Sequence, residues 1–291
     1  MAASHPKKTL ENSMTQEIWL GDCLEKMRDI PDESIDVVIT DPPYGIDYEE
    51  WDVLHKNTNI ALGGVSPAQK KSSFKRRGKP INGWSGADKN IGKEYQEWCE
   101  KWMVELFRVT KPASPILIFN SRRFYHRAAI AVENSGLMVK DMLSWRKNKA
   151  NGKAQDVNKI PQIIKSGKVF KNYRVGNLKP IFEPIIFAAK PYKGTLAKCI
   201  LENGNGGFFS FGSDIRENIF SCEGEAGLHP TQKPLKLMQD LILTFSSEGQ
   251  TILDPFSGSG TTLLAAKNLG RSFIGIEKEE KYYSICLNRL K

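Results

Sequence analysis

Cysteine and histidine are scarce in this 291-residue sequence, and neither gathers into a motif. There are four histidines, and no Cys-x-x-Cys pair occurs among the five widely spaced cysteines, Cys23, Cys99, Cys199, Cys222 and Cys286. This spacing argues against a zinc site and against a disulfide framework. We therefore expect no metal, and cysteines without disulfides favour a cytoplasmic protein.

Long hydrophobic runs are also missing. No stretch approaches the ~18 consecutive apolar residues that a membrane-spanning helix needs, so an integral membrane protein is excluded. Residues 1–13 are polar and lack the apolar core of a secretory signal, and we expect a flexible extension there, with Met14 an equally good start. With 40% hydrophobic and 26% charged residues, the rest of the chain is typical of a globular protein.

What the sequence has in excess is positive charge in two places. The net charge is +9, but residues 146–200 hold thirteen basic side chains against Asp156 and Glu183, so this stretch carries +11 and the remainder −2. A second run places six cations within ten residues: Lys70, Lys71, Lys75, Arg76, Arg77 and Lys79. Such clusters are typical of proteins that neutralise phosphate groups, although charge alone also allows a solvated basic face.

Strand and helix patterns alternate outside the basic stretch. The pattern predicts strands over 34–40, 115–119, 137–145, 251–254 and 272–276, and helices through 95–111 and over 122–134, 234–247, 263–269 and 279–290. This alternation predicts an α/β fold with an open, mostly parallel sheet and helices on both faces. We expect a long mobile loop over 45–92, and in the basic segment 146–228 only 184–189 reads as a buried strand.

A glycine-containing loop lies between the last two predicted strands. It reads Asp254-Pro255-Phe256-Ser257-Gly258-Ser259-Gly260-Thr261-Thr262, and Glu277 follows Gly258 by 19 residues. Glycines let a ligand approach the backbone closely, and a carboxylate about 20 residues on accepts hydrogen bonds from ribose hydroxyls. The third glycine of the dinucleotide fingerprint is absent. The pattern therefore predicts a nucleoside site whose ligand has an uncharged linkage.

A second motif, Asp41-Pro42-Pro43-Tyr44, ends the strand over 34–40. The amine of a nucleobase is a poor nucleophile because its lone pair is delocalised into the ring. The Asp41 carboxylate and the Pro42 carbonyl, aimed by two rigid rings, can accept hydrogen bonds from such an amine. Tyr44 offers a face for an extruded base. A local turn capped by Asp41 is the alternative.

These blocks resemble the beta group of amino-group DNA methyltransferases, in which the Asp-Pro-Pro-Tyr block comes first and the Phe-x-Gly-x-Gly block last. Two further blocks of that family are present, namely Gly21-Asp22-Cys23-Leu24 and His229-Pro230-Thr231-Gln232-Lys233-Pro234. The resemblance implies a Rossmann-like methyltransferase sheet with an inserted basic target-recognition region. It divides the chain into a catalytic half at 14–145, the target-recognition region at 146–228 and a cofactor-binding half at 229–291.

The resemblance also implies residue roles, with S-adenosylmethionine as the cofactor and no metal. The catalytic residues would be Asp41, Pro42, Pro43 and Tyr44. The cofactor contacts would be Asp22, Cys23, Thr231, Lys233, Asp254, Pro255, Phe256, Ser257, Gly258, Ser259, Gly260, Thr261, Thr262 and Glu277. We expect double-stranded DNA as the partner, with phosphate contacts from Lys70, Lys71, Lys75, Arg76, Arg77, Lys79, Arg146, Lys147 and Lys149.

The expected reaction is methyl transfer to the amine of a base flipped out of duplex DNA. In the resembling family an aspartate at the first catalytic position usually accompanies adenine, and a serine usually accompanies cytosine, so N6 of adenine is favoured over N4 of cytosine. Methylation at cytosine carbon-5 is excluded, because the known enzymes use a cysteine that follows a proline and none of the five cysteines does. An RNA or protein-amide methyltransferase and a binding module without catalysis are the remaining alternatives. The resemblance also allows a homodimer and a cognate restriction endonuclease, in the cytoplasm of a bacterial, archaeal or phage-infected cell.

Overall fold

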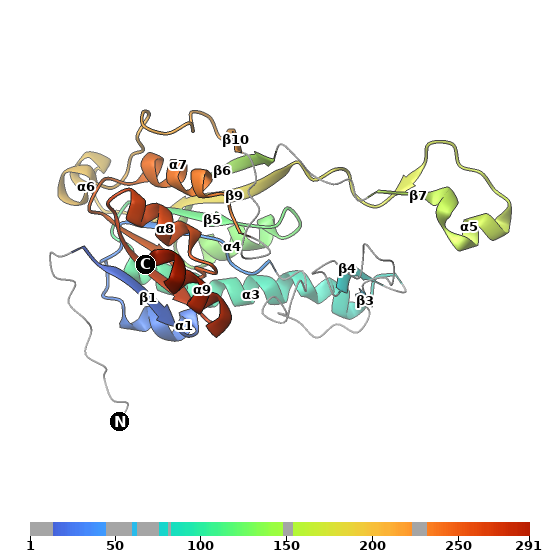
Figure 1. Cartoon of the computed structure of the whole chain (residues 1–291), viewed down its shortest axis with the longest axis horizontal. Helices are drawn as coiled ribbons and strands as arrows, with labels where there is room; N and C mark the ends of the chain where they lie inside the picture. Colours follow the sequence, from blue (N-terminus) through green and yellow to red (C-terminus); the bar gives the residue numbers. More distant parts are fainter. Residues whose placement is uncertain (1–13, 45–59, 63–75, 81–82, 148–153, 223–231) are drawn as a thin grey trace, which may run out of the picture.

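A sheet of eight strands forms the centre of the computed structural model, which describes residues 14–44, 60–62, 76–80, 83–147, 154–222 and 232–291 (Figure 1). The strands are β1 (Gln16–Leu20), β2 (Val37–Thr40), β5 (Pro115–Phe119), β6 (Met138–Lys147), β9 (Phe182–Ala189), β10 (Ile219–Cys222), β11 (Thr251–Asp254) and β12 (Ser272–Glu277). Their order across the sheet is β1-β12-β11-β2-β5-β9-β6-β10.

The sheet is mostly parallel, which confirms the predicted fold class. Strands β1, β12, β11, β2 and β5 run in one direction, and β10 is parallel to β6. Strand β9 is antiparallel to both of its neighbours, β5 and β6. It comes from the segment 146–228, and so does β10. That segment therefore contributes two strands to the central sheet in addition to the parts that lie outside it.

Helices cover both faces of the sheet, as the alternating pattern predicts. One face packs against α1 (Cys23–Lys26), the short 3-10 helix η1 (Met27–Asp29), α3 (Gly86–Val109) and α4 (Tyr125–Asn134). The other face packs against α7 (Leu235–Phe245), α8 (Thr261–Asn268) and α9 (Glu280–Leu290). In Figure 1, helix α6 (Leu196–Asn203) lies to the left of α7, and β10 lies to the right of it.

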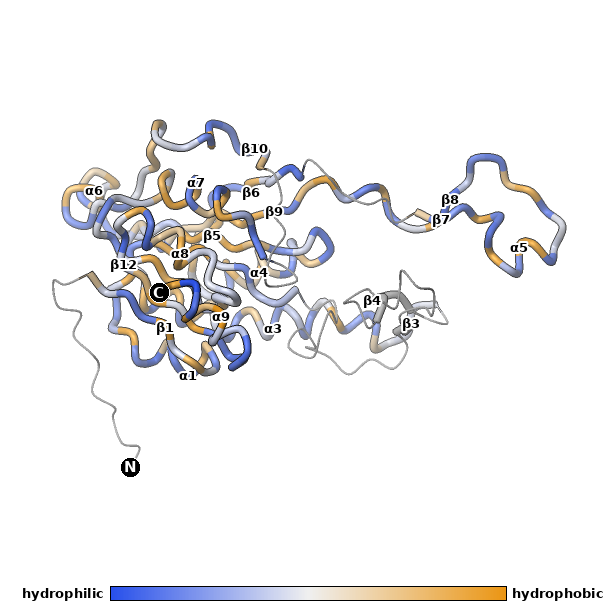
Figure 2. The backbone as a smooth tube through the Cα atoms, in the orientation of Figure 1, coloured by the Kyte–Doolittle hydropathy of each residue, from blue (hydrophilic) through white to orange (hydrophobic). Residues whose placement is uncertain are grey.

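The strands are apolar on both sides because both faces are covered. Along β2, Val38 packs into one core while Val37 and Ile39 pack into the other, as the two-residue period of a strand requires. All three side chains are fully buried, which stabilises the fold by about 1.5–3 kcal/mol for each. Hydrophobic stretches accordingly gather in the central strands and their covering helices (Figure 2). In the described part of the chain, no helix is long and apolar enough to cross a membrane.

Helix α3 begins earlier than the sequence predicts. Ser85 caps it, since its hydroxyl accepts from the Asp88 amide and the Asp88 carboxylate accepts from the Ser85 amide. Residues 86–92, which we assigned to the long loop over 45–92, are therefore the first turns of a helix. The same segment contains an antiparallel pair, β3 (Ile60–Leu62) and β4 (Arg76–Pro80). Helical periodicity is weak in Gly86–Gly92, and the capping box is the signal that the sequence analysis missed.

An arm of residues 154–181 extends away from the body of the protein, at the right of Figure 1. It contains the short antiparallel pair β7 (Gln155–Asp156) and β8 (Arg174–Val175), the 3-10 helix η3 (Val157–Lys159) and α5 (Pro161–Ser166). Pro161 occupies the first turn of α5, and Gly167 ends the helix in the left-handed conformation. The arm leads into β9, and most of its side chains are exposed.

Packing between α8 and β12 yields a first prediction. A Cβ added to Gly275 would overlap with Cδ1 of Leu263, which is fully buried, so the leucine must shift within a packed core. We expect Gly275→Ala to lower the free energy of unfolding by about 1–3 kcal/mol, measured by urea denaturation. Gly86→Ala, where no atom lies within 4 Å of the added Cβ, is the matched control and should be neutral or stabilising. Equal effects of the two substitutions would contradict this account.

Candidate active site

The two predicted motifs meet where the direction of the strand order reverses. Strands β2 and β11 are parallel neighbours, and the chain leaves them toward opposite sides of the sheet, through β5 and β12 respectively. In open α/β sheets, ligands bind at the carboxyl ends of the strands at such a point. Asp41 follows β2 and Asp254 ends β11. The Thr40 hydroxyl donates a 2.7 Å hydrogen bond to Asp254 Oδ1, which ties the two loops together.

The glycine loop packs tightly onto the last helix. Gly260 has a φ of +78°, and a Cβ there would overlap with Sγ of Cys286 in α9. Only glycine meets both demands, and α8 begins directly after it with Thr261 and Thr262, both buried. Arg289 donates to the Ser259 carbonyl at 2.7 Å and to the Thr261 hydroxyl at 3.1 Å. The loop is therefore held from behind by α9.

Glu277 stands at the end of β12 and lies against the same loop. Its Oε2 accepts from the Gly258 amide at 2.8 Å, and its Oε1 accepts from the Glu279 amide at 2.8 Å. Burial raises the pKa of this carboxyl, and the two backbone amides counter part of that rise. A carboxylate that receives two amide N–H groups at a strand end also has lone pairs suited to ligand hydroxyls.

The block at Asp22 and Cys23 lies beside β12. Asp22 caps α1 by accepting from the Leu24 amide at 3.0 Å, and Lys278 donates to its other oxygen at 3.1 Å. Gly21 donates its amide to the Glu277 carbonyl at 2.9 Å, so this turn and Glu277 are neighbours. Cys23 is buried, and burial raises the pKa of its thiol to about 12, which leaves it unreactive.

Three aromatic rings are in contact at the glycine loop: Phe256 of the loop, and Trp98 and Trp102 of α3. Phe256 is in edge contact with Trp102 at a centroid distance of 5.1 Å and is tilted against Trp98 at 5.7 Å. Pairs of this kind contribute about 0.5–1.5 kcal/mol each beyond the area that they bury. Trp98 and Trp102 are one turn apart in α3, where Trp102 belongs to the core and Trp98 packs against it. These two tryptophans thus fix the position of Phe256 within the loop.

At the end of β2, five polar side chains form one connected cluster. The Tyr44 hydroxyl lies 2.7 Å from Asp41 Oδ1 and 2.6 Å from Glu183 Oε1. The Lys233 ammonium group is paired with Asp41 Oδ2 and, at 2.9 Å, with Glu183 Oε1. Lys147, at the end of β6, is paired with the other oxygen of Glu183.

The pKa values in this cluster reflect burial and charge together. Burial raises the pKa of Asp41, Lys233 opposes that rise, and the charge of Glu183 adds to it. Burial also disfavours the charge of Glu183, but Lys233 and Lys147 outweigh it and lower its pKa to about 2. For Tyr44, burial and both carboxylates raise the pKa well above its usual value, so the hydroxyl stays protonated. The Lys233 pKa is raised because Asp41 and Glu183 outweigh its burial.

Glu183 is the site residue that sequence reasoning missed. It was counted only as one of two acids in a basic stretch, and no motif marks it. Because β9 is antiparallel to β5, its amino end lies at the edge where the parallel strands end, beside Asn120. An acid directly before the predicted strand 184–189, in a stretch with thirteen cations and one other acid, is the signal that could have pointed to it.

Several expected contacts cannot be placed at this site. Arg146 is exposed on β6, whereas Lys147 is engaged with Glu183. For Arg76, Arg77 and Lys79 the structure describes only the backbone of β4. The remaining predicted contacts, Lys70, Lys71, Lys75, Lys149 and Thr231, lie outside the described residues. Lys233, one of the predicted cofactor contacts, is paired with both carboxylates of the cluster.

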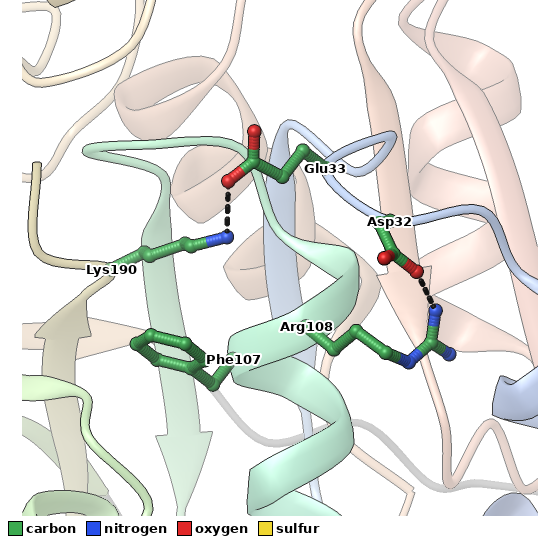
Figure 3. A pocket seen from close by; sticks show the side chains of 5 residues that line it. All are labelled: Asp32, Glu33, Phe107, Arg108 and Lys190. Carbon is green, nitrogen blue, oxygen red and sulfur yellow. Dashed lines mark hydrogen bonds and ion pairs between the residues drawn. The ribbon is translucent and has the colours of Figure 1, made fainter.

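A cavity of about 420 Å³ lies at the other end of the strands, where the parallel strands begin (Figure 3). Its charged groups pair with one another: Lys190 donates to Glu33 at 2.8 Å, and Arg108 donates to Asp32 at 2.6 Å. Lys190 directly follows β9, and Glu33 precedes β2, so these groups sit where the parallel strands begin. The first pair joins the end of β9 to the loop before β2, and the second joins α3 to that loop. Neither Asp41 nor Asp254 lines this cavity.

The residues at the carboxyl edge fit a nucleoside ligand better than a metal ion. Glu277 offers a buried carboxylate next to a loop in which Gly258 and Gly260 have positive φ. Among the described residues, no three His, Cys, Asp or Glu side chains are grouped closely enough to hold a metal ion. The carboxylates of Asp41 and Glu183 are instead neutralised by two lysines.

Comparisons with known proteins point to one family. The family model of N6/N4 methyltransferases, described as DNA methylase, matches residues 35–288. The chain is 46% identical to the Type II methyltransferase M.HindIII of Haemophilus influenzae, covering 94% of each protein. It is 29% identical to the Type II methyltransferase M.HinfI of Haemophilus influenzae, covering 96% of this chain and 69% of that one.

Solved structures share the fold. The complex of M1.HpyAVI with SAM matches with a TM-score of 0.54 and 23% identity, covering 94% of this chain and 99% of that one. The cytosine-N4-specific PvuII DNA methyltransferase matches with a TM-score of 0.60 and 16% identity, covering 95% and 88%. At these identities the likeness concerns the fold alone.

The buried Asp254 yields a prediction of pH dependence. Burial raises its pKa to about 6, so the folded state holds this proton more tightly than the unfolded state. Ionisation therefore costs stability as the pH rises from about 4 through 6. Asp254→Asn removes that loss. We compare the free energy of unfolding of the variant with that of wild type by urea denaturation at each pH. We expect this difference to favour the variant more at pH 7.5 than at pH 4, by on the order of 1–3 kcal/mol.

Asp214→Asn is the control for that experiment. Asp214 is exposed, and its hydrogen bond with Lys236 lowers its pKa, so it should show no gain of this sign. A difference between Asp254→Asn and wild type that is the same at both pH values would contradict the buried, readily protonated state of Asp254.

Proposed function

The chain belongs to the N6/N4 DNA methylase family and is a DNA methyltransferase, and from this premise we propose that it methylates N6 of adenine in duplex DNA. The observation that carries the proposal is the meeting of two motifs at one point of the sheet. Asp41, at the end of β2, and the glycine loop, at the end of β11, are joined by the hydrogen bond from Thr40 to Asp254. A base amine and a methyl donor must be brought together in this way.

S-adenosylmethionine is the proposed cofactor, and when bound it supplies an activated methyl group. Glu277 would accept hydrogen bonds from its ribose hydroxyls, and Gly258 and Gly260 would allow the backbone to approach it. As the family resemblance implies, Asp22 would lie near its adenine ring. Thr231 and Lys233 would lie near its methionine end. The M1.HpyAVI structure, a SAM complex with the same fold, supports this choice of cofactor.

The cluster at Asp41 provides the chemistry at the base. Asp41 and the Pro42 carbonyl would accept hydrogen bonds from the target amine, which draws its lone pair out of the ring. The raised pKa of Asp41 suits this carboxylate to take up the proton that the amine releases. Tyr44 remains protonated and neutral, and its ring would stack on the flipped base.

DNA is expected to contact the arm and the strands that lead into it. Residues 154–181 contain one acid, Asp156, against the basic residues Lys159, Lys165, Lys168, Lys171, Arg174 and Lys179. Tyr173 is exposed and lies 6.2 Å from the Phe170 ring, which adds aromatic surface among these cations. Phosphate contacts position a duplex, and the target sequence would be read by the arm and the rest of 146–228.

Other parts of the proposal rest on the family alone. The name Type II methyltransferase of the two relatives supports a role in restriction and modification, with a cognate endonuclease as a partner. The resemblance described above also allows a homodimer and a cytoplasmic location.

Nucleoside analysis of the product tests the proposal. The purified chain is incubated with labelled S-adenosylmethionine and unmethylated bacteriophage duplex DNA, and the digested DNA is analysed by mass spectrometry. We expect N6-methyladenine. N4-methylcytosine would retain the fold and the mechanism but overturn the assignment of the base. No label in DNA, with cofactor binding intact, would overturn the proposed substrate.

A pair of variants separates the two halves of the site. Asp41→Ala should lower methyl transfer by at least about 100-fold and leave cofactor binding largely intact, because Asp41 acts on the base. Gly258→Leu should abolish cofactor binding, because φ is +54° there and a side chain would enter the loop. Turnover is measured with labelled cofactor and binding by isothermal titration calorimetry. Near-normal turnover of Asp41→Ala would refute the mechanism.

A further inference from the structure

Glu183 occupies a place for which the reaction as proposed above gives no role. It lies on β9, is 7% exposed, and accepts from three donors in the catalytic cluster: Tyr44, Lys233 and Lys147. Two of these, Tyr44 and Lys233, are also partners of Asp41. Asp41 and Glu183 therefore share the same donors.

The shared hydroxyl can serve only one carboxylate at a time. Tyr44 has a single hydroxyl proton, yet its oxygen lies 2.7 Å from Asp41 Oδ1 and 2.6 Å from Glu183 Oε1. If the proton points to Glu183, Asp41 Oδ1 is released from Tyr44 and can receive another donor. If it points to Asp41, that oxygen is occupied. Glu183 thus decides whether one of the two oxygens of Asp41 is available.

The shared ammonium group has three N–H donors and is paired with both carboxylates at once. Lys233 is 6% exposed, so its charge must be balanced inside the cluster. Without Glu183, Asp41 would be the one carboxylate among the described residues paired with Lys233, and it would stay engaged with it. With Glu183 present, Lys233 has a second anion at 2.9 Å, and it can leave Asp41 Oδ2 without becoming an unpaired buried charge.

We propose that Glu183 is a positioning residue for methyl transfer, which holds the Tyr44 hydroxyl and Lys233 so that Asp41 is free to receive the target amine. The inference rests on the proposed function, since it concerns the same amine. In the transfer step the amine nitrogen forms a bond to the methyl carbon as the bond from that carbon to sulfur breaks. The amine proton then passes to Asp41 and on to solvent. Glu183 itself touches neither base nor cofactor.

Glu183 also connects the arm with the site. Its second oxygen is held by Lys147 at the end of β6, and the two residues lie at the two ends of the chain segment that contains the arm. The Lys147 side chain is 33% exposed and lies over the Trp145 ring at 4.7 Å. A phosphate that attracted Lys147 would leave Glu183 to Lys233 and Tyr44, which is the arrangement that releases Asp41.

Glu183→Gln tests the proposal, with single-turnover transfer measured across pH at saturating DNA and cofactor. The titratable and charged groups that face Asp41 are Lys233, Glu183, Tyr44 and, from β11, Asp254. Asp41 must be ionised to accept the amine, so the rate falls as the pH drops through its pKa. Removing the charge of Glu183 leaves Lys233 wholly to Asp41. We expect about a 10- to 100-fold lower rate and an acid limb displaced to lower pH.

Cofactor affinity and a matched control distinguish positioning from folding. Glu183→Gln should retain binding of S-adenosylmethionine, because Lys233 keeps Asp41 as its partner and no ion pair joins Glu183 to the glycine loop in the described structure. Glu202→Gln removes an exposed acid, paired with Lys198 at 3.8 Å on α6, and should leave both the rate and its pH profile unchanged. A wild-type rate and pH profile for Glu183→Gln would overturn the inference. A wild-type enzyme that transfers no methyl group to DNA would instead overturn the proposed function.

Should Glu183→Gln fail to bind cofactor, Lys147→Met tests the same arrangement with the opposite sign. Loss of Lys147 leaves Glu183 entirely to Lys233 and Tyr44, so the pKa of Asp41 rises and the acid limb moves to higher pH. An acid limb that stays in place would overturn the inference.

Discussion

The hydrogen bond between Thr40 and Asp254 joins the two parts of the sheet on which the site depends. Strands β2 and β11 are neighbours, but the chain reaches them about 210 residues apart and leaves them in opposite directions. Only two residue pairs register these strands with each other, Ile252 with Val37 and Leu253 with Val38. A buried side-chain bond directly beyond them fixes the two loops at their carboxyl ends. The glycine loop and Asp41 are then held in one arrangement by the same contact.

Much of the fold was predictable because the sheet is covered on both faces. The apolar run 115–119 and the segment 251–254, with its buried Ile252 and Leu253, were predicted as strands, and the structure has strands with those bounds. The loop residues at 254–260 and Asp41–Tyr44 were predictable for a different reason. Glycine permits left-handed backbone and proline fixes φ, so both residue types mark loops that are visible in the sequence.

What the sequence could not indicate depends on contacts between distant segments. Glu183 reaches Asp41 only because β9 runs against its neighbours, and no local pattern distinguishes a parallel from an antiparallel strand in a sheet of this kind. Lys147 and Lys233 were expected to contact DNA and cofactor, yet the structure pairs both with Glu183. The sequence position of a lysine does not indicate which of several carboxylates or phosphates it will pair with. The early start of α3 was missed because its capping box has Asp88 where glutamate is more usual.

The antiparallel strand β9 also has a consequence for how the protein can change. Strands β6 and β9 are paired from Met138 with Ala189 to Arg146 with Phe182, so the arm is the far end of a hairpin whose base is part of the sheet. The tip of a hairpin can become longer or shorter, or be replaced, without changing the pairing of β6 with β9. All hydrogen bonds between these two strands lie on the sheet side of the tip. Under the proposed function, in which the arm reads the target sequence, new target preferences can therefore be acquired at the tip while the strands that lead to Asp41 and Asp254 are inherited unchanged.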